Sequence, residues 1–145
     1  MHIPTDDLTP DDIRPDRDLT GVSLNKASLS DVDLSGASLD DVDLQNADLS
    51  GADLSTATLI KANLRNANLR NIDLTNANLQ HADLSKAGLS YADLSGAILY
   101  GADLSGADLR FATLTGADLR QTGLSLKEYR KAGAVVCGEE LRGES

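Results

Sequence analysis

Leucine stands at every fifth position from Leu19 to Leu124, 22 times without exception. The residue two places before each leucine is almost as constant. From residue 22 to residue 117 it is alanine sixteen times and valine or isoleucine at the other four positions. We therefore divide the chain into five-residue words that begin at this residue, so that Ala47-Asp48-Leu49-Ser50-Gly51 is one word with leucine third.

A period of five excludes a simple helix and a flat strand. An amphipathic helix repeats its apolar residues every 3.6 positions and a half-buried strand every second position. Within one word, however, Ala-Asp-Leu alternates between inward and outward as a short strand does. The fourth and fifth residues are mostly Ser, Gly, Asn or Thr, which favour turns. The sequence predicts short strands joined by turns, in coils that bury Leu and Ala against neighbouring coils.

Words such as ADLSG, ANLRN and ADLRF resemble the pentapeptide repeat family, and the resemblance covers residues 18–124. It implies an all-β fold: a right-handed quadrilateral (square) parallel β-helix with four words, about 20 residues, in each coil. The 22 words then make about five and a half coils, roughly 26 Å tall at a strand spacing of ~4.8 Å. Leucines predicted for the structural core are Leu34, Leu54, Leu69, Leu74, Leu94 and Leu109.

Both ends of such a stack present open edges that need covering. At the N-terminal end, Thr9 is expected to cap a short helical turn that begins at Pro10, with Asp12 near the helix dipole. Leu8 and Ile13 lie one residue out of phase with the leucine repeat, and we expect them to anchor this cap. The predicted division of the chain is an N-terminal cap (1–17), the β-helix (18–124), a C-terminal helix and lid (125–138) and a disordered tail (139–145).

The C-terminal end carries a capping-box pattern, Ser125-Leu126-Lys127-Glu128, that predicts a helix over roughly 126–132. Gly133 ends it, and the apolar residues 134–137 follow as a strand or lid. The side chains expected to seal the last coil are Leu126, Tyr129, Val135 and Val136. The family resemblance implies a second role for the same surface, as the contact of a homodimer.

Composition narrows the class of protein. The only cysteine is Cys137, so no intrachain disulfide can form. No apolar run approaches the ~20 residues of a membrane span. The first residues, MHIPTDDLTPDD, lack the basic and apolar regions of a signal peptide. We therefore expect a cytoplasmic protein without membrane contact.

The formal net charge of −10 is concentrated in the first part of the chain. Residues 1–58 hold 13 acidic and 3 basic side chains, residues 59–86 hold 2 and 4, and residues 87–145 hold 8 and 6. Direct nucleic-acid binding is not expected, because phosphate contacts need Lys and Arg. A solubilising surface and a surface for a basic partner both remain open.

The acidic side chains follow the repeat. On the square model, Asp33, Asp53, Asp73 and Asp93 form one column with steps of ~5 Å. The structural interpretation is that each carboxylate accepts hydrogen bonds from nearby turn N–H groups, since Asn, Ser and Thr replace Asp at equivalent sites. The functional interpretation is a charge column that imitates a phosphate backbone.

No constellation for catalysis is found in the sequence. His2 and His81 have no nucleophile pattern nearby, and Cys137 lies in an apolar context. A G-x-S-x-G element and phosphate-binding glycine loops are absent. No Cys–His or Glu-rich cluster predicts a metal site. We expect no enzyme activity, no cofactor and no metal.

A few words deviate from the polar, small-residue pattern of the outward positions. Ile60, Ile98 and Tyr100 are predicted to share one face, and Tyr91 is predicted to stack with Phe111 near another corner. Exposed apolar residues on so polar a surface mark candidate partner contacts, although the aromatic rings could instead only cover turns. The band KANLRNANLRN, residues 61–71, places its basic residues on successive sides as a ring: Lys61, Arg65 and Arg70.

These observations favour a non-enzymatic scaffold whose rigid β-helix binds a protein partner that the sequence does not name. The alternative comes from the resemblance: some family members mimic DNA in width and charge, bind type II topoisomerases such as gyrase and protect them from quinolones. Here the third residue of every word is leucine, whereas those members also use Phe at this place. No loop interrupts the stack in this chain. Both departures count against the alternative.

Overall fold

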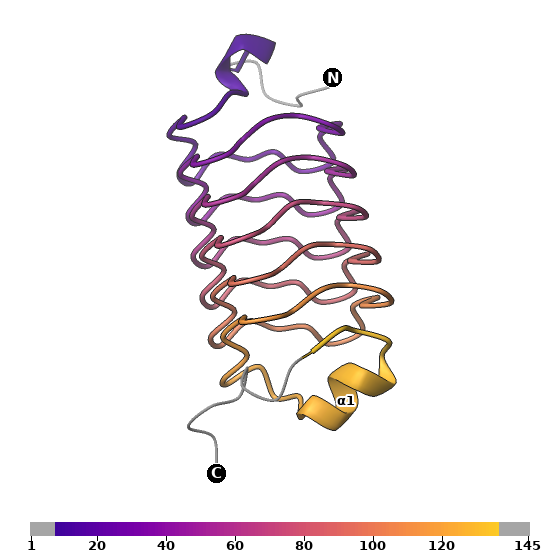
Figure 1. Ribbon diagram of the computed structural model, residues 1–145. Coiled ribbons are helices and arrows are strands. Elements are labelled where there is room, and N and C mark those ends of the chain that lie inside the picture. The colour runs from indigo at the N-terminus through magenta and orange to yellow at the C-terminus, as the bar shows by residue number, and fades with distance from the viewer. Residues whose placement is uncertain (1–7, 137–145) are drawn as a thin grey trace.

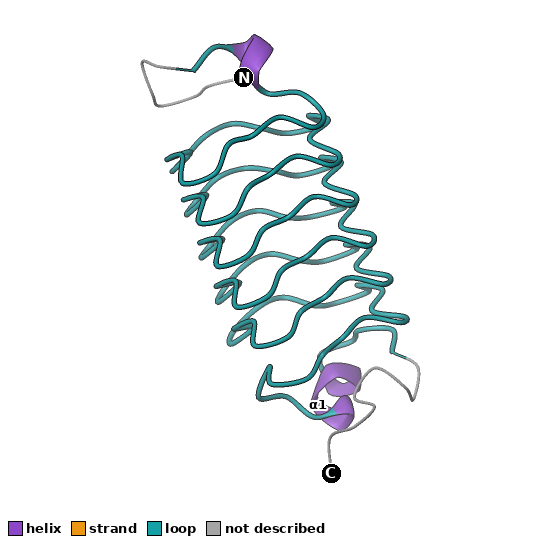
Figure 2. Cartoon of the chain, turned by 90° about the vertical axis from the view of Figure 1, so that its left-hand side faces the viewer, coloured by secondary structure: helices purple, strands orange, loops and turns teal. Residues whose placement is uncertain are grey.

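The structure, a computed structural model of the chain, describes residues 8–136. These residues form a stack of coils with one short helix at each end, η1 (Pro10–Asp12) and α1 (Leu126–Lys131) (Figure 1). Between the two helices the backbone consists of turns and three-residue extended segments (Figure 2).

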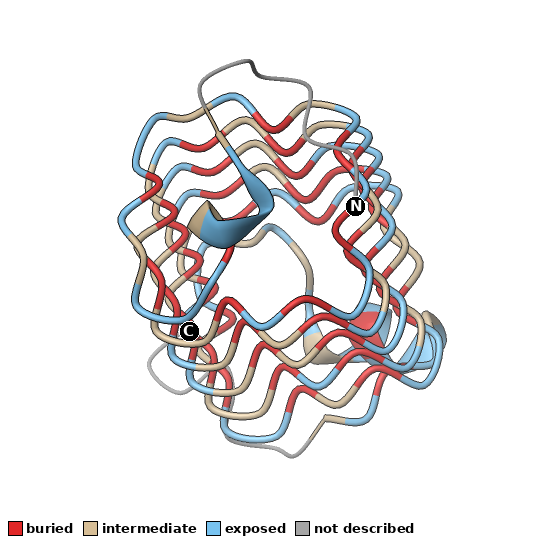
Figure 3. Ribbon diagram, turned by 90° about the horizontal axis from the view of Figure 1, so that it is seen from above, coloured by how far each residue is buried: buried red, intermediate tan, exposed pale blue. Residues whose placement is uncertain are grey.

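Each coil contains four words. Parallel β-bridges join the second residues of words that lie 20 positions apart, from Asp18 with Ser38 to Ile98 with Asp118. Viewed along the stack, the coils superimpose as a four-sided outline with buried and exposed residues alternating along every side (Figure 3). Consecutive words are therefore consecutive sides of the coil.

The sequence predicts short strands, and the structure has isolated bridges instead. The reason is the length of the extended segment. Only three residues lie between one turn and the next, and only the second makes a bridge to both neighbouring coils, as Asp48 does with Ser28 and Asn68. The hydrogen bonds nonetheless repeat as in a parallel sheet: the Leu49 N–H donates to the Asn68 carbonyl at 2.9 Å, and the Asn68 N–H donates to the Ala47 carbonyl at 2.9 Å.

The corners are type II turns. In the turn that follows Leu44, the Ala47 N–H donates to the Leu44 carbonyl at 3.0 Å, and Asn46 has a φ of 60°. A positive φ at this place favours Gly or Asn, yet Lys26, His81 and Tyr91 also adopt it. For such residues the left-handed region costs about 1–2 kcal/mol. The coil geometry imposes it, because each of these N–H groups donates to the next coil, as Tyr91 does to the Arg110 carbonyl at 3.0 Å.

The interior is a lattice of leucine and alanine. Every third-position leucine from Leu19 to Leu119 is at most 2% exposed, including the predicted core residues Leu34, Leu54, Leu69, Leu74, Leu94 and Leu109. Because the main chain satisfies its own polar groups between coils, these positions need no polar side chain. Within residues 8–136, the only buried aromatic side chain is Tyr129, at the C-terminal end of the stack.

The N-terminal end follows the predicted pattern over its described part. η1 begins after Thr9, whose N–H and hydroxyl both donate to the Asp12 carboxylate at 2.9 Å. Asp12 also forms an ion pair with Arg17 at 2.8 Å. Ile13 is buried, and Leu8 packs against the same core. Residues 1–7 of the predicted cap lie outside the described residues.

At the C-terminal end, α1 begins with the predicted capping box. The Ser125 N–H donates to the Glu128 carboxylate at 2.7 Å and the Glu128 N–H donates to the Ser125 hydroxyl at 3.3 Å. Gly133 follows the helix with a φ of 86°. Tyr129 is fully buried, and its hydroxyl donates to the Thr122 hydroxyl at 2.6 Å.

The residues after α1 differ from the predicted lid. Val135 is expected to seal the last coil, but it is 53% exposed. It forms a parallel bridge with Thr113, which places it in the outward-facing second position of a word. Leu126 and Val136 are half-buried. The predictions for Cys137 and for the tail, residues 139–145, concern positions outside the described residues.

Candidate interaction surfaces

The stack has four flat sides, which we call faces A to D in chain order. They are identified by their second-position residues: face A runs from Asp18 to Asp118, face B from Ser23 to Asp103, face C from Ser28 to Asp108 and face D from Asp33 to Thr113. Face A lies opposite face C, and face B opposite face D, because consecutive words are consecutive sides (Figure 3).

Face D carries the aspartate column. Bridges join Asp33 to Asp53, Asp53 to Asp73 and Asp73 to Asp93, so the four residues stand above one another. Among its words, which span 32–36, 52–56, 72–76, 92–96 and 112–116, no Lys or Arg occurs. Face D is therefore acidic over its first four words and uncharged at Thr113.

Each of these carboxylates also has a local structural role. Asp33 accepts hydrogen bonds from the Ser35 N–H at 3.0 Å and the Ser35 hydroxyl at 2.7 Å. The same two bonds lower the pKa of Asp33. Asp73 and Asp93 make the equivalent pair of bonds to Thr75 and Ser95. Since one oxygen of each is used in its own turn, the column has a structural explanation whether or not it binds a partner.

Face C ends in an aromatic corner, which we call the C/D corner. Its fifth-position residues are, in order, Asp31, Gly51, Asn71, Tyr91 and Phe111. The rings of Tyr91 and Phe111 stack with their centroids 5.0 Å apart and an interplanar angle of 20°. Tyr91 is 51% exposed and Phe111 is 62% exposed, so the rings pack on each other and leave one side of the pair in solvent.

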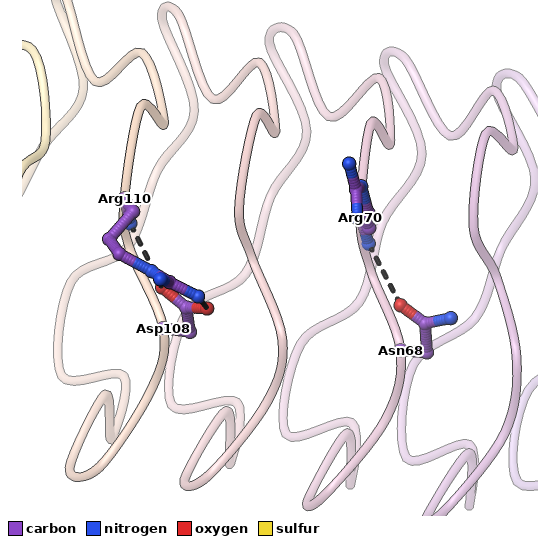
Figure 4. A network of polar contacts seen from close by, with 4 residues as sticks. All are labelled: Asn68, Arg70, Asp108 and Arg110. Atoms are coloured by element: carbon purple, nitrogen blue, oxygen red, sulfur yellow. Dashed lines mark hydrogen bonds and ion pairs between the residues drawn. The ribbon is translucent and has the colours of Figure 1, made fainter.

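Two arginines, Arg70 and Arg110, project from face C two coils apart (Figure 4). The guanidinium of Arg70 lies 5.5 Å from the Tyr91 ring centroid, a cation–π distance. Arg110 forms a two-pronged ion pair with Asp108, at 2.9 Å from Nε and 2.7 Å from the terminal nitrogen. The hydrogen bond from Arg110 lowers the pKa of Asp108. Tyr and Arg are the residue types most enriched at the energetic centres of protein interfaces.

Face A carries a second, less exposed aromatic group. Tyr100 makes an edge contact with His81 at 5.7 Å between ring centroids, and the Arg120 guanidinium lies 5.6 Å from the Tyr100 ring. Ile98 is 37% exposed in the same word, while Ile60, two coils earlier, is half-buried. The predicted grouping of Ile60, Ile98 and Tyr100 thus falls on one face.

Sequence reasoning missed the arginines that complete both groups. A 20-residue alignment of the words carries the signal, because it puts Arg70 and Arg110 in one column beside Tyr91, and Arg120 one coil after Tyr100. The basic residues of the middle band lie as predicted on successive sides: Lys61 on face A, Arg65 on face B and Arg70 on face C.

The described residues 8–136 contain no group of three His, Cys, Asp or Glu side chains arranged to hold a metal ion. Over the same residues, no helix is both long and apolar enough to cross a membrane. His2 and Cys137 lie outside this range, and His81 is an exposed corner residue. The exposed clusters at the C/D corner and on face A are therefore the candidate sites of this chain.

Comparison with known proteins identifies the repeat. The family model described as pentapeptide repeats matches residues 18–55, 52–90 and 87–125, with eight copies. This chain belongs to the pentapeptide repeat family. Proteins of the family form right-handed quadrilateral β-helices, and they are generally non-catalytic structural or interaction proteins.

Several solved pentapeptide repeat proteins are similar to this chain. Alr5209 from Nostoc PCC 7120 is 39% identical, with 79% of this chain and 84% of that chain covered and a TM-score of 0.36. HetL from Nostoc sp. strain PCC 7120, which is involved in heterocyst differentiation regulation, is 34% identical over 83% of this chain, with a TM-score of 0.41. This chain spans 60% of the length of HetL.

A more distant likeness is to QnrB1, a plasmid-mediated fluoroquinolone resistance protein. A trypsin-treated form of it is 20% identical, with 87% of this chain and 80% of that chain covered and a TM-score of 0.40. A comparison with curated protein sequences gives no match.

Proposed function

We propose that this pentapeptide repeat protein is a non-enzymatic, cytoplasmic scaffold that binds a protein partner through its deviating words. The observation that carries the proposal is the C/D corner. Tyr91 and Phe111 are large, exposed and fixed by stacking, so little side-chain entropy is lost when a partner covers them. The neighbouring Arg70 and Arg110 supply charged hydrogen-bond donors beside the rings.

The two helical ends support the rigidity that a scaffold needs. η1 and α1 lie at opposite ends of the coil stack (Figure 1). We propose that they act as caps of about five and a half coils, since Ile13 at one end and Tyr129 at the other belong to the apolar core. A capped stack leaves its four faces for binding.

The experiment compares partner capture by the wild-type protein and by the double variant Tyr91→Ser plus Phe111→Ser. A matched control is Asn46→Ser plus Asn66→Ser, another pair of fifth-position residues one coil apart. Partners that bind the wild type and the control but not the aromatic variant support the proposal. If all three proteins capture identical partners, the C/D corner is not the binding surface.

Face D motivates a second candidate, a DNA mimic that binds a type II topoisomerase such as gyrase. Its column carries one carboxylate per ~4.8 Å, compared with one phosphate per ~3.4 Å along a DNA strand. A supercoiling assay with gyrase tests this candidate. Inhibition by the wild type that is lost in Asp33→Asn, Asp53→Asn, Asp73→Asn and Asp93→Asn combined supports it; no effect of the wild type at micromolar concentration excludes it.

A further inference from the structure

We propose that face C and its C/D corner bind a second copy of this chain, side by side and antiparallel. The inference rests on the proposed function, because it names the partner for one of the two aromatic surfaces. It leaves face A, on the opposite side, free on both copies. The pair then presents two outward-facing copies of the Tyr100 surface, as expected of a bivalent scaffold.

The charges of face C change sign along the stack. Its first two words, 27–31 and 47–51, carry Asp31 and Asp48 and no basic residue. The next three words carry Arg70 and Arg110, together with one acidic residue, Asp108, that is paired with Arg110. Parallel copies would bring like charges to the same height. Antiparallel copies can instead bring the acidic word 47–51 of one, with Asp48, against word 107–111 of the other, with Arg110.

The shapes along the C/D corner change in the same direction. Small residues, Gly51 and Asn71, precede the two large rings. Consider a two-fold axis in the plane of the contact, perpendicular to the stack and between the third and fourth words of face C. It pairs Phe111 with Gly51 of the other copy, and Tyr91 with Asn71 of the other copy. Each large ring then meets a small residue, and each of these contacts occurs twice in the dimer, as a self-complementary two-fold contact requires.

The same register avoids clashes at the centre of face C. It places Arg70 opposite Ser90 rather than opposite itself, and Arg110 opposite Ser50, next to Asp48. It also pairs Asn68 with Gly88, which has no side chain. A Cβ built at Gly88 would have its nearest neighbours 4.0 Å away, so the position is open to an incoming side chain.

The other faces fit a second copy less well. Face D has aspartates and no basic residue, so two copies of it repel each other. On face A the tyrosine is half-buried, whereas both rings of the C/D corner are more than half exposed. Four paired words of face C span only ~19 Å along the stack, so the contact is smaller than the ~800 Å² per partner of a stable complex. We therefore expect a weak dimer, with a Kd of about 0.1 mM, that salt dissociates.

The test uses two variants of the full chain, one in which face C is made acidic and one in which it is made basic. The acidic variant combines Arg70→Asp with Arg110→Ser, and the basic variant combines Asp48→Asn with Ser50→Arg, at the position opposite Arg110. Sedimentation equilibrium at low salt should show the wild type as a weak dimer and each variant alone as a monomer. An equimolar mixture of the two variants should form a heterodimer, because the acidic face of one then meets the basic face of the other.

The variants use residue types that this fold already holds at equivalent positions. Asp40 occupies a fourth position, which is the precedent for Arg70→Asp. Ser105 occupies the fourth position of a word with Asp103 second, which is the precedent for Arg110→Ser beside Asp108. Arg65 and Arg120 occupy fourth positions, and Asn68 occupies a second position. Thermal melts check the folding of both variants. Arg65→Asp is the matched control, since it changes the same residue type at the fourth position of face B, and it should dimerise as the wild type does.

Two results overturn the inference: a wild type that stays monomeric at about five times the expected Kd, or charge variants that dimerise as tightly as the wild type. A dimer that survives in both variants and is lost when Tyr129 is changed to Ala would place the contact at the C-terminal end instead. The proposed function has a separate readout, because partner capture through face A is measured with Ile98→Ser plus Tyr100→Ser. A wild type that does not dimerise but still captures its partner through face A refutes the inference alone.

Discussion

Faces C and D are built on the same backbone from the same five-residue word, yet they present opposite surfaces. Face D repeats Asp, Ser, Thr and Gly with little variation. Its carboxylates accept hydrogen bonds from N–H groups two residues later, in their own turns. Face C replaces the small residues with Arg70, Tyr91, Arg110 and Phe111. The interior beneath the two faces is the same, since Leu69 under face C and Leu74 under face D are both buried.

The comparison separates two kinds of residue. First- and third-position residues determine the fold, and they are nearly constant. Fourth- and fifth-position residues vary more, and Gly, Asn, Lys, His, Tyr and Phe all adopt the positive φ of the corner. A large aromatic residue in a left-handed corner is not needed for the fold, which supports the proposal that the C/D corner is a contact surface.

The largest expected effect comes from placing a charge in the shared interior. Leu69→Lys and Leu74→Lys should each prevent folding, because an unpaired ammonium group would be buried among apolar side chains. Circular dichroism and solubility measure the outcome. A soluble variant with an unchanged thermal midpoint would contradict the core assignment for its face.

A milder change sharpens the comparison. Leu69→Ala and Leu74→Ala should each lower the free energy of unfolding by about 2–5 kcal/mol through the cavity that remains. The two losses should agree closely, because both leucines are fully buried third-position residues of the same apolar core. Denaturant unfolding measures them; a much smaller loss under one face would mean that the interior is not uniform.

The aromatic corner should behave differently. Tyr91→Asn plus Phe111→Asn removes a stacking contact of about 0.5–1.5 kcal/mol but places a residue that tolerates the left-handed region at both corners. The two effects oppose each other, so the thermal midpoint should change little while self-association is lost. Thr56→Asn, at the corner after face D, is the control and should leave self-association intact. A large loss of stability in the double variant would show that the rings serve the fold.

The smallest effect concerns acid stability. The pKa of Asp33 on face D is lowered by hydrogen bonds from Ser35, and that of Asp108 on face C chiefly by the hydrogen bond from Arg110. Both folded values lie below the ordinary value of 3.8, so each carboxylate stabilises the fold above that pH and loses its effect as the pH falls through the folded pKa. Asp33→Asn and Asp108→Asn should therefore each be slightly less stable than the wild type at neutral pH.

The differences should disappear in strong acid, where the wild-type carboxylates are protonated too. Thermal midpoints measured from neutral pH to below about pH 3 test this expectation. A difference that persists in strong acid would show that the asparagine disturbs the turn itself, independently of charge.

Much of the fold follows from the sequence because the repeat leaves little choice. Leu at every fifth position cannot face one side of a helix or a flat strand, and the family resemblance supplied the four-word coil. The stacking of Tyr91 on Phe111 can also be predicted from the sequence, since the two residues are one coil apart. Their exposure does not follow from the sequence, because a ring at a corner can either cover a turn or face the solvent.

Other features depend on details that the pattern does not carry. Arg70 reaches Tyr91 and Arg110 turns back to Asp108, although both arginines occupy the fourth position of a word. Their directions depend on which side chains the adjacent coils present. Val135 lies outside the repeat, and its exposure depends on pairing with Thr113, which no periodicity predicts.

The most direct test of the central claim is an amide NMR titration of the labelled chain with its own unlabelled copy. If the deviating words carry the interaction, signals from the C/D corner should shift, those of Gly51, Asn71, Tyr91 and Phe111 most of all. Signals from face D, such as Asp53 and Asp73, should remain in place. Shifts confined to face D or to α1, or no shifts at millimolar concentration, would contradict the account.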